Sequence, residues 1–536
     1  MQPKPTRHLR TRCLALAGVA LASFLSIASA SAEMVYRVAT MGEPKTLDPH
    51  GVSGTWENII VGDQFMGLLT DDAAAHPIPG AAESWTVSDD GLVYTFKLRD
   101  HKWSDGQPVT ADDFVFSFQR ILDPALAAEY ASLLYPIKNA EAINSGKITD
   151  KTQLGVKALD SKTLEITLEG PTGYFLELLT HYTAFPVPKH VVEKLGTDWI
   201  KPGNFVSNGP YKVIEWTPHA QVVAVKNPEF YDAANVKIDK VIYYPDEDRN
   251  AVTKRFRAGE IDFQDDFASE QIDFLRKELP AETRIAPYIG TYYYVTNFNR
   301  KPFDDERVRK ALSMAIERDA ITDKVLKTGE VPAYGVVPPG TGGEWVGYEP
   351  DWKALPYAER VAMAKALLAD AGYGPDNPLK VELAYNTSEN HKRIAVAIQS
   401  MWKALGVQAE LVNREVKVHY DTLKQNDFDV ARAAWVADYN DPQNFLYLLE
   451  TRTGVQNYGR YSNPEFDKLM TDQGLTKDQA ARMAMMKDAE EIAMGQNAWL
   501  PIYYYVSKAL VSQKLEGYVD NAKHTHRARW MSIKEG

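Results

Sequence analysis

The chain has almost no cysteine. Cys13 is the only one among 536 residues, and it precedes the apolar run from Leu14 to Ala28, whereas the cysteine of a lipoprotein is expected directly after such a run. A lipid anchor is therefore not expected. Once residues 1–32 are removed no thiol remains, which excludes disulfide and thiol chemistry in an oxidising compartment.

Long apolar runs are also absent after residue 28. The single N-terminal run is shorter than the roughly 20 residues that span a bilayer. It follows a basic segment and precedes Ala30-Ser31-Ala32, the small-residue pattern of a cleavage site. This arrangement predicts a cleavable secretory signal peptide over residues 1–32 and a periplasmic mature chain that starts near Glu33.

Positive charge is scarce. The chain has 60 Lys and Arg against 72 Asp and Glu, for a formal charge of −12. Residues 1–32 hold four of the basic residues and no acidic one, so the charge becomes −16 without them. An acidic chain of this kind argues against nucleic acid or an anionic membrane surface as a partner.

Catalytic signatures are missing as well. The chain has no H-E-x-x-H, no G-x-S-x-G and no G-x-x-x-x-G-K-[ST] motif. The segment GTGGEW, 340–345, lacks the last glycine of a dinucleotide loop, so it is interpreted as a flexible loop. His524 and His526 are two residues apart with no third ligand nearby, which favours an exposed strand over a metal site. A dispersed Ser-His-Asp set stays open at this point, but the prediction is a protein that is not an enzyme and has no cofactor or metal.

What is present is a pattern of alternating strands and amphipathic helices, which indicates an α/β fold. About 500 residues predict roughly two to four structural units. Val93 to Arg99 and Thr163 to Glu169 alternate like strands. Helices are expected over Ala111 to Leu122, with Thr110 as a possible cap, and over Asp304 to Arg318. Two tyrosine triplets, 292–294 and 503–505, should lie on strands, with each middle ring on the opposite face from its neighbours.

The stretch FDVARAAWVADYNDPQNF, 428–445, places charge in what should be a buried strand. Ionised groups are rarely buried without a partner, so Arg432 and Asp438 either form internal ion pairs or face a ligand cleft. Asp438 follows the strand and precedes turn residues. Ligands of open α/β sheets bind outside the carboxyl ends of strands, which favours the cleft.

This stretch closely resembles a segment of the periplasmic oligopeptide-binding proteins of peptide ABC transporters. Five further blocks share the resemblance in the same order: RDHKWSDGQPVTADDFVFSFQRILDP, 99–124; FVSNGPYKVIEW, 205–216; GTYYYVTN, 290–297; KPFDDERVRKALSMAIERDAI, 301–321; and PIYYYV, 501–506. The resemblance implies a two-lobed, type II periplasmic-binding-protein-like fold with an extra inserted domain. Mapped onto this chain, lobe I comprises 33–65, 190–291 and 506–536, the insertion 66–189, and lobe II 292–505. The hinge strands then cross near Gly290 and Val506.

The resemblance also implies a set of ligand-binding residues. Asp438 matches the position that pairs with the α-ammonium of the ligand, and Arg432 and His391 match positions used toward ligand carboxylates. For His391 alone, a surface histidine at a helix start is the simpler interpretation. The ligand main chain would pair with strand edges near Gly290 and Val436. Other cleft positions match Tyr130, Asn386, Trp435 and Tyr504.

Three departures from the enteric oligopeptide binders affect groups that handle the carboxyl end of the ligand. Leu423 replaces an Arg beside Lys424, Ser53 replaces a Glu, and the loop at Glu344 and Trp345 lacks a Lys. An Arg-to-Leu change is also associated with the murein tripeptide binders. Gly290 and Val436 replace a cysteine pair.

The predicted function is a periplasmic receptor, expected to be a monomer, that captures a small peptide and delivers it to the permease and ATPase subunits of an ABC transporter. A cell-wall peptide is one of the ligands that this prediction includes. The alternatives left open are a receptor for dipeptides, opines, sugars or metal chelates, a peptidase, and a chaperone-like binder of unfolded segments.

Overall fold

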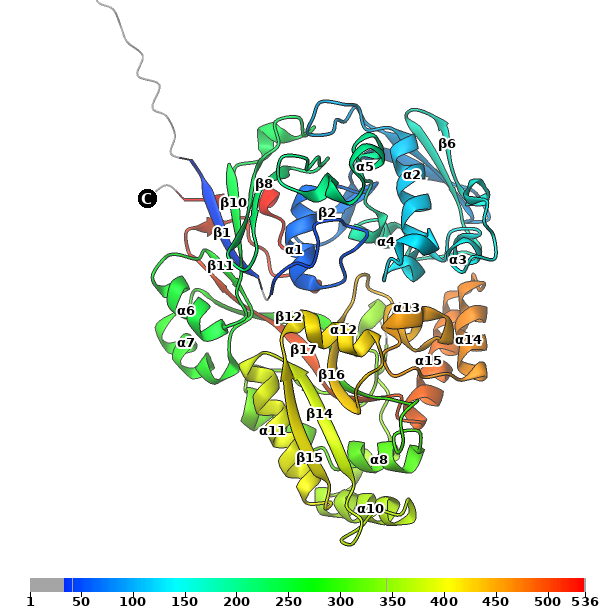
Figure 1. Cartoon of the computed structure of the whole chain (residues 1–536), viewed down its shortest axis with the longest axis vertical. Coiled ribbons are helices and arrows are strands. Elements are labelled where there is room, and N and C mark those ends of the chain that lie inside the picture. Colours follow the sequence, from blue (N-terminus) through cyan, green and yellow to red (C-terminus); the bar gives the residue numbers. More distant parts are fainter. Residues whose placement is uncertain (1–32, 41, 344, 535–536) are drawn as a thin grey trace, which may run out of the picture. The chain divides into compact units, whose positions relative to one another are not determined.

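The computed structural model describes residues 33–40, 42–343 and 345–534 (Figure 1). The predicted signal peptide, 1–32, and Glu344 lie outside the described residues. Within the described part, no helix has both the length and the hydropathy needed to cross a bilayer.

The main sheet has eleven strands of mixed direction. Its order is β15-β14-β16-β12-β17-β11-β1-β10-β9-β8, with β13 paired to β17. The strands in that order are β15 Gln408–Arg414, β14 Lys380–Asn386, β16 Val430–Val436, β12 Thr283–Thr296, β17 Trp499–Val511, β11 Phe263–Asp265, β1 Val35–Thr40, β10 Lys240–Pro245, β9 Gln221–Lys226 and β8 Tyr211–Thr217, with β13 at Val331–Pro332.

Two long antiparallel strands, β12 and β17, join the two halves of this sheet. Their pairing is interrupted between Pro287 and Thr291. Beyond the interruption on one side β17 pairs with β11, and on the other side β12 pairs with β16. Both tyrosine triplets lie on these strands, as predicted. Tyr292 and Tyr294 pack in one hydrophobic cluster and Tyr293 in another, which confirms the alternation of that triplet.

A separate four-stranded antiparallel sheet has the order β4-β5-β7-β6. Its strands are β4 Ala82–Val87, β5 Val93–Leu98, β7 Thr163–Thr167 and β6 Val156–Asp160. The predicted strands and the helix that follows are confirmed. Helix α2 spans Ala111–Ile121, and the Asp113 carboxylate accepts hydrogen bonds from the N–H of Thr110 at 2.9 Å and from its hydroxyl at 3.0 Å. Two small sheets pair β2 Leu69–Asp71 with β3 Pro77–Pro79, and β18 Leu515–Glu516 with β19 Ser532–Ile533.

The helix expected over Asp304 to Arg318 is shorter. Helix α8 spans Glu306–Met314 and α9 spans Arg318–Ala320, because the Arg318 side chain turns inward to reach backbone carbonyls, including that of Ser313 at 3.0 Å. The other helices are α1 Thr55–Gln64, α3 Ala140–Asn144, α4 Phe175–Leu178, α5 Lys189–Leu195, α6 Arg249–Arg257, α7 Ile272–Glu278, α10 Tyr357–Asp370, α11 Glu389–Lys403, α12 Val416–Lys424, α13 Gln443–Leu446, α14 Pro464–Gly474 and α15 Gln479–Gly495.

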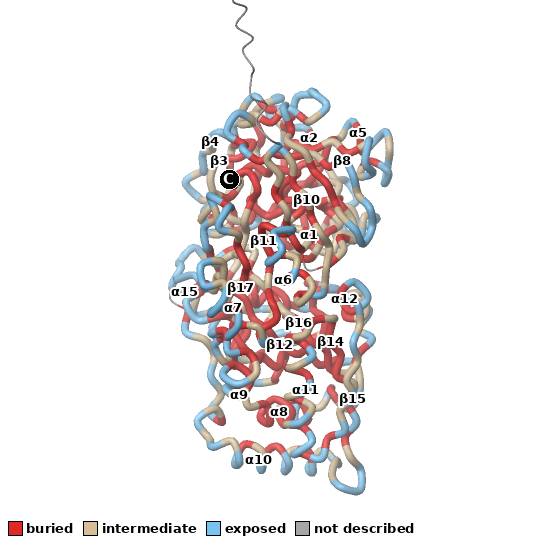
Figure 2. The backbone as a smooth tube through the Cα atoms, turned by 90° about the vertical axis from the view of Figure 1, so that its left-hand side faces the viewer, coloured by how far each residue is buried: buried red, intermediate tan, exposed pale blue. Residues whose placement is uncertain are grey.

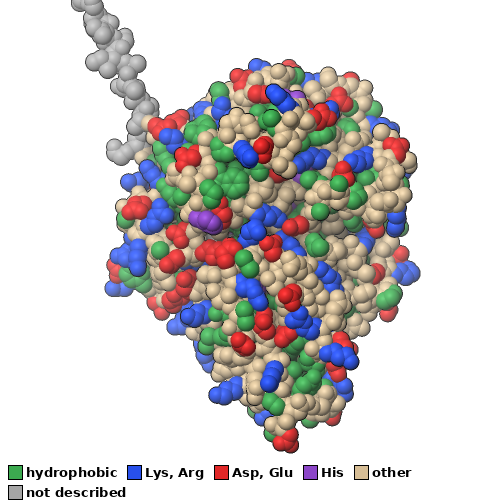
Figure 3. All heavy atoms as spheres, viewed as in Figure 1, with side chains coloured by type: hydrophobic (Ala, Val, Ile, Leu, Met, Phe, Trp, Pro, Cys, Tyr) green, Lys and Arg blue, Asp and Glu red, His purple; other side chains and the backbone are tan. Residues whose placement is uncertain are grey.

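Buried residues follow the central strands β12, β14, β16 and β17 (Figure 2). Within the GTGGEW segment, Thr341–Gly343 forms a 3-10 turn, and the indole N–H of buried Trp345 donates to Glu490 at 3.1 Å. On the face shown in Figure 3, acidic and basic side chains are interspersed rather than gathered by sign.

Candidate ligand-binding site

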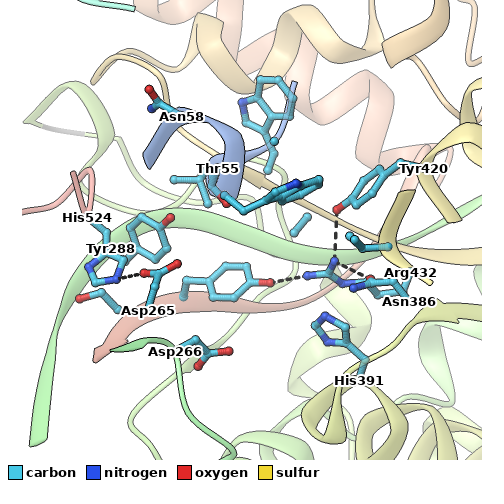
Figure 4. Close-up of a pocket in the computed structure, with 18 of the residues that line it drawn as sticks. Thr55, Asn58, Asp265, Asp266, Tyr288, Asn386, His391, Tyr420, Arg432 and His524 are labelled. Carbon is cyan, nitrogen blue, oxygen red and sulfur yellow. Dashed lines mark hydrogen bonds and ion pairs between the residues drawn. The ribbon is translucent and has the colours of Figure 1, made fainter. Parts of the chain in front are cut away.

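A cavity lies against the middle of the main sheet, with about 1360 Å³ of space between the surrounding atoms when the part open to solvent is included. Segments far apart in sequence form its wall: the start of α1, the 130–182 region, the end of β11, the β14–α11 connection, α12, β16 and β17 (Figure 4). Charged and aromatic side chains both line it.

Strand β16 presents an unpaired edge to the cavity. It pairs with β12 along its whole length, but with β14 only at Val430 and Ala431. The N–H of Ala437 donates to Ile289, so by antiparallel alternation the backbone groups of residues 432, 434 and 436 face away from β12. Nε2 of His419 lies 2.8 Å from the carbonyl oxygen of Arg432, so this carbonyl already has a hydrogen-bond partner. Ala434 and Val436 therefore leave N–H and C=O groups available for an extended chain.

Asp438 lies just past this strand and lines the cavity, with its side chain 13% exposed. Its Oδ1 is 3.1 Å from Nε2 of His181. The N–H of Thr183 donates to Nδ1 of that histidine, which leaves Nε2 to face the carboxylate. The backbone N–H of Asp438 donates to Asn444. Among the described residues no Lys or Arg lies within ion-pair distance of Asp438, so its carboxylate is available to a ligand cation.

Arg432 is 6% exposed and lines the same cavity. Its guanidinium donates to Asn386 Oδ1 at 3.0 Å and to the hydroxyls of Tyr420 and Tyr505 at 3.2 and 2.8 Å. No carboxylate of the described residues lies within ion-pair distance, and Nε has no acceptor there. A nearly buried cation with three neutral partners is suited to an anionic ligand group.

His391 lies next to Arg432 on the first turn of α11 and is 8% exposed, so the surface interpretation is wrong. Burial, with a smaller contribution from Arg432, lowers its pKa well below the ordinary value. It is therefore a neutral imidazole that can exchange hydrogen bonds with a ligand carboxylate, while Arg432 carries the charge.

The side of the cavity near β11 has more charged side chains than the side near Arg432. Arg249 pairs with Asp266 at 2.9 Å, and Lys508 pairs with Asp266 at 3.5 Å and with Glu330 at 3.2 Å. Asp265 is 2.6 Å from Nε2 of His524. His524 and His526 are not on an exposed strand as expected: their segment is irregular, and the His524 side chain is only 7% exposed. Among the described residues, no group of three or more His, Cys, Asp or Glu is placed to hold a metal.

The structure brings seven of the nine predicted residues to this cavity wall: Tyr130, Asn386, His391, Arg432, Trp435, Val436 and Asp438. Gly290 lies just behind, paired with Val436. Tyr504 does not line the cavity. Its hydroxyl contacts Gly335, because alternation along β17 turns Tyr503 and Tyr505 toward the cavity and the ring between them away.

The positions at which this chain departs from the enteric oligopeptide binders have different surroundings. Leu423 is fully buried in the main hydrophobic cluster and is not on the cavity wall. Lys424 pairs with Glu129 at 2.7 Å, and Glu129 also accepts from Lys45 at 2.8 Å. Ser53 does line the cavity. The position of the missing arginine is therefore closed by apolar packing.

Sequence reasoning missed several wall residues, above all Asp265, Tyr288 and Lys508. It also missed His181, which contacts Asp438. Each comes from a segment far from the 428–445 stretch. His524 was singled out by its spacing to His526, but nothing local indicated its contact with Asp265.

Comparison with known proteins identifies the family to which this fold belongs. Residues 76–457 match the family model of bacterial extracellular solute-binding proteins, family 5. The chain is 44% identical to the periplasmic oligopeptide-binding protein OppA of Salmonella typhimurium, over 89% of this chain and 88% of that protein. It is 42% identical to the periplasmic murein peptide-binding protein MppA of Escherichia coli, over 92% and 91%.

The solved structure of E. coli MppA superimposes with a TM-score of 0.91 at 40% identity, covering 94% of this chain and 99% of that one. The fold is the two-lobed periplasmic-binding-protein-like fold with an additional domain, as the resemblance predicted. The chain belongs to family 5 of the bacterial extracellular solute-binding proteins, whose members bind solutes and are not enzymes.

Proposed function

We propose that this protein is a periplasmic receptor that captures oligopeptides and delivers them to an ABC-type permease driven by separate ATPase subunits. The observation that carries the proposal is the unpaired edge of β16, with a carboxylate at one end and an uncompensated guanidinium at the other. A peptide has the complementary features: a backbone with donors and acceptors, an ammonium and a carboxylate.

An extended peptide would add a strand to β16 through Ala434 and Val436. Each backbone hydrogen bond contributes about 1 kcal/mol net and does not depend on side-chain identity. Asp438 would accept the α-ammonium, and Arg432 with neutral His391 would hold the carboxylate. Backbone pairing with charged ends selects for peptides in general and leaves side-chain preference to the cavity wall.

The proposed lobes keep the boundaries predicted from sequence, 33–65, 190–291 and 506–536 for lobe I, 66–189 for the insertion, and 292–505 for lobe II. The interruption of pairing between Pro287 and Thr291 falls beside the predicted crossing at Gly290, and Pro287 pairs with Val506 at the other crossing. Ligand bound between the lobes would favour a closed arrangement by its preference for that state, and the transporter would recognise it.

The relatives support a peptide ligand without selecting one, since oligopeptide-binding and murein peptide-binding proteins are about equally similar. Burial of Leu423 at the position of the missing arginine favours a ligand whose far end is not an ordinary carboxyl terminus, such as a cell-wall peptide. We also propose a monomer, exported to the periplasm by residues 1–32.

Calorimetry on the purified protein, refolded from denaturant to remove co-purified ligand, tests the proposal. A tripeptide with a free N-terminus should bind one to one, and its N-acetylated form should not bind measurably. Asp438→Asn should weaken the free tripeptide at least about 100-fold, because it leaves the ammonium without its charged partner. Asp427→Asn, an exposed carboxylate close to the same strand, is the matched control and should change little.

Equal binding of free and acetylated peptides would overturn the ammonium anchor. No peptide binding by the folded protein would overturn the peptide assignment, and mass spectrometry of the co-purified solute would then identify another ligand. Loss of binding on shortening to dipeptides, together with saturation at one ligand, separates this receptor from a dipeptide binder and from a chaperone. A panel of ordinary tripeptides that bind as tightly as murein tripeptide would remove the cell-wall preference.

A further inference from the structure

Two carboxylates of the cavity have the same kind of surroundings. Asp438 contacts Nε2 of His181, whose ring stacks on Tyr130 at 5.3 Å. Asp265 contacts Nε2 of His524, whose ring meets Tyr288 edge-on at 5.4 Å. Both carboxylates and both tyrosines line the cavity. Because the first carboxylate is the proposed ammonium anchor, the second has the same chemistry available.

Asp265 has no Lys or Arg as a partner. It is 8% exposed, and no Lys or Arg of the described chain lies within ion-pair distance of it. The adjacent cations are already engaged, since Arg249 pairs with Asp266 and Lys508 with Asp266 and Glu330. These two cations and two anions cancel. The basic side chain that does contact Asp265 is the imidazole of His524, at 2.6 Å.

The second histidine adds no charge. His526 Nε2 lies 3.0 Å from Nδ1 of His524. Burial, with further contributions from His524 and Arg527, lowers the pKa of His526 well below the ordinary value, so that ring is neutral. A nearly buried carboxylate without a Lys or Arg partner is costly, and a ligand cation would reduce that cost.

A chain of ring contacts connects this carboxylate to the carboxylate-binding end of the cavity. Arg432 donates to the hydroxyl of Tyr505, whose ring lies 5.9 Å from Tyr288. Tyr288 in turn contacts His524, and His524 contacts Asp265. Figure 4 shows Arg432 at the right of the pocket and Asp265, Tyr288 and His524 at its left. Aromatic faces beside a carboxylate suit an ammonium group.

We propose that Asp265 is a second ammonium-binding carboxylate, which recognises the side-chain ammonium of a diamino acid, of the lysine or diaminopimelate class, near the carboxyl end of the bound peptide. This inference rests on the proposed function. The cavity wall then carries two carboxylates, Asp438 and Asp265, and the guanidinium of Arg432. The matching ligand presents an α-ammonium, a carboxylate and a second ammonium.

The test uses tripeptides that differ only in the third side chain: lysine, N-ε-acetyl-lysine and norleucine. Wild-type protein should bind the lysine peptide about 10-fold or more tightly than the two neutral ones, as expected for a charge-assisted contact. In Asp265→Asn this preference should fall to about one while the norleucine peptide binds as before. Asp438→Asn is the contrasting variant, since it should weaken all three peptides by a similar factor.

Each outcome decides a different question. Binding of all three peptides with equal affinity to wild type overturns the second site and leaves the peptide receptor in place. A lysine preference that survives Asp265→Asn also overturns it. If no tripeptide binds, the proposed function itself fails. Should Asp265→Asn not fold, the comparison of lysine with acetyl-lysine on wild type, with ornithine and diaminobutyrate in place of lysine to vary the reach of the ammonium, still decides whether the cavity binds a second cation.

Discussion

Arg318 and Arg432 are two of the buried arginines that have no carboxylate partner in the described structure, and they differ in how they are satisfied. Arg318 is 1% exposed and donates to the carbonyls of Ser313, Ile316, Ala333 and Pro501 and to the Ser313 hydroxyl, with distances from 2.7 to 3.2 Å. Arg432 is 6% exposed and makes three hydrogen bonds, all to side chains.

The difference distinguishes an arginine with a structural role, Arg318, from one in the candidate ligand-binding site, Arg432. Fixed backbone carbonyls saturate Arg318, and the rings of Tyr334 and Trp352 cover it at 4.6 and 5.6 Å. Arg432 faces a cavity, and its partners are an amide and two hydroxyls. A buried guanidinium therefore does not by itself indicate ligand binding. What indicates it is an incomplete set of acceptors next to open space.

The largest effect is expected from Arg318→Met. Removing the cation leaves several buried carbonyls without donors, and the free energy of unfolding should fall by about 4 kcal/mol. Peptide affinity of the molecules that remain folded should be unchanged. Urea unfolding gives the first quantity and calorimetry the second. A stability loss below about 1 kcal/mol would mean that solvent or relaxation replaces these bonds.

Arg432→Met should do the reverse. Affinity for a tripeptide with a free carboxyl terminus should fall by about 2–3 kcal/mol, roughly 30- to 150-fold, because a ligand anion loses its charged partner. The free energy of unfolding without ligand should stay level or rise, since an uncompensated buried charge is removed. The matched ligand is the C-terminal amide of the same peptide, which should lose little affinity. Equal losses for acid and amide would show that Arg432 only shapes the cavity.

How much of this was predictable from sequence depends on the range of the interactions. Strands β5 and β7 and the cap of α2 follow from local alternation and from Thr110 and Asp113, which lie three residues apart. Resemblance to the family placed seven of the predicted residues on the wall, and four of them, Arg432, Trp435, Val436 and Asp438, lie in the matching segment 428–445. Tyr504 shows the limit of this approach, since a shift of one residue along a strand changes the face.

The histidine contacts that Asp438 and Asp265 share could not be predicted from local sequence patterns. Asp438 and His181 lie on segments more than 250 residues apart, and so do Asp265 and His524. No spacing rule relates such positions, because sheet order and chain crossings bring them together. The same holds for Arg318, whose acceptors at Ala333 and Pro501 come from β17 and a loop.

The smallest of the expected effects is the pH dependence of the free energy of unfolding, which arises from the histidine that binds the backbone carbonyl of Arg432. The acceptors of Arg318 are mostly backbone carbonyls that do not titrate, whereas the carbonyl of Arg432 is held by Nε2 of His419 at 2.8 Å. Burial lowers the pKa of His419 to about 3, against about 6.5 in the unfolded chain. Below pH 6.5 the unfolded state therefore binds a proton that the folded state does not, and stability is lost as the pH falls.

The loss from this one group is about 1.4 kcal/mol per pH unit, or about 2 kcal/mol at pH 5. In His419→Gln the group no longer titrates, so the stability difference between wild type and variant should narrow by that amount between pH 7.5 and pH 5. Urea unfolding of both proteins across this range measures it. The other buried histidines, His50, His101 and His391, titrate in both proteins and cancel in the difference. If the free energies of unfolding of wild type and variant changed in parallel with pH, His419 would take up its proton in the folded state. The backbone around Arg432 would then be as insensitive to acid as the backbone carbonyls that bind Arg318.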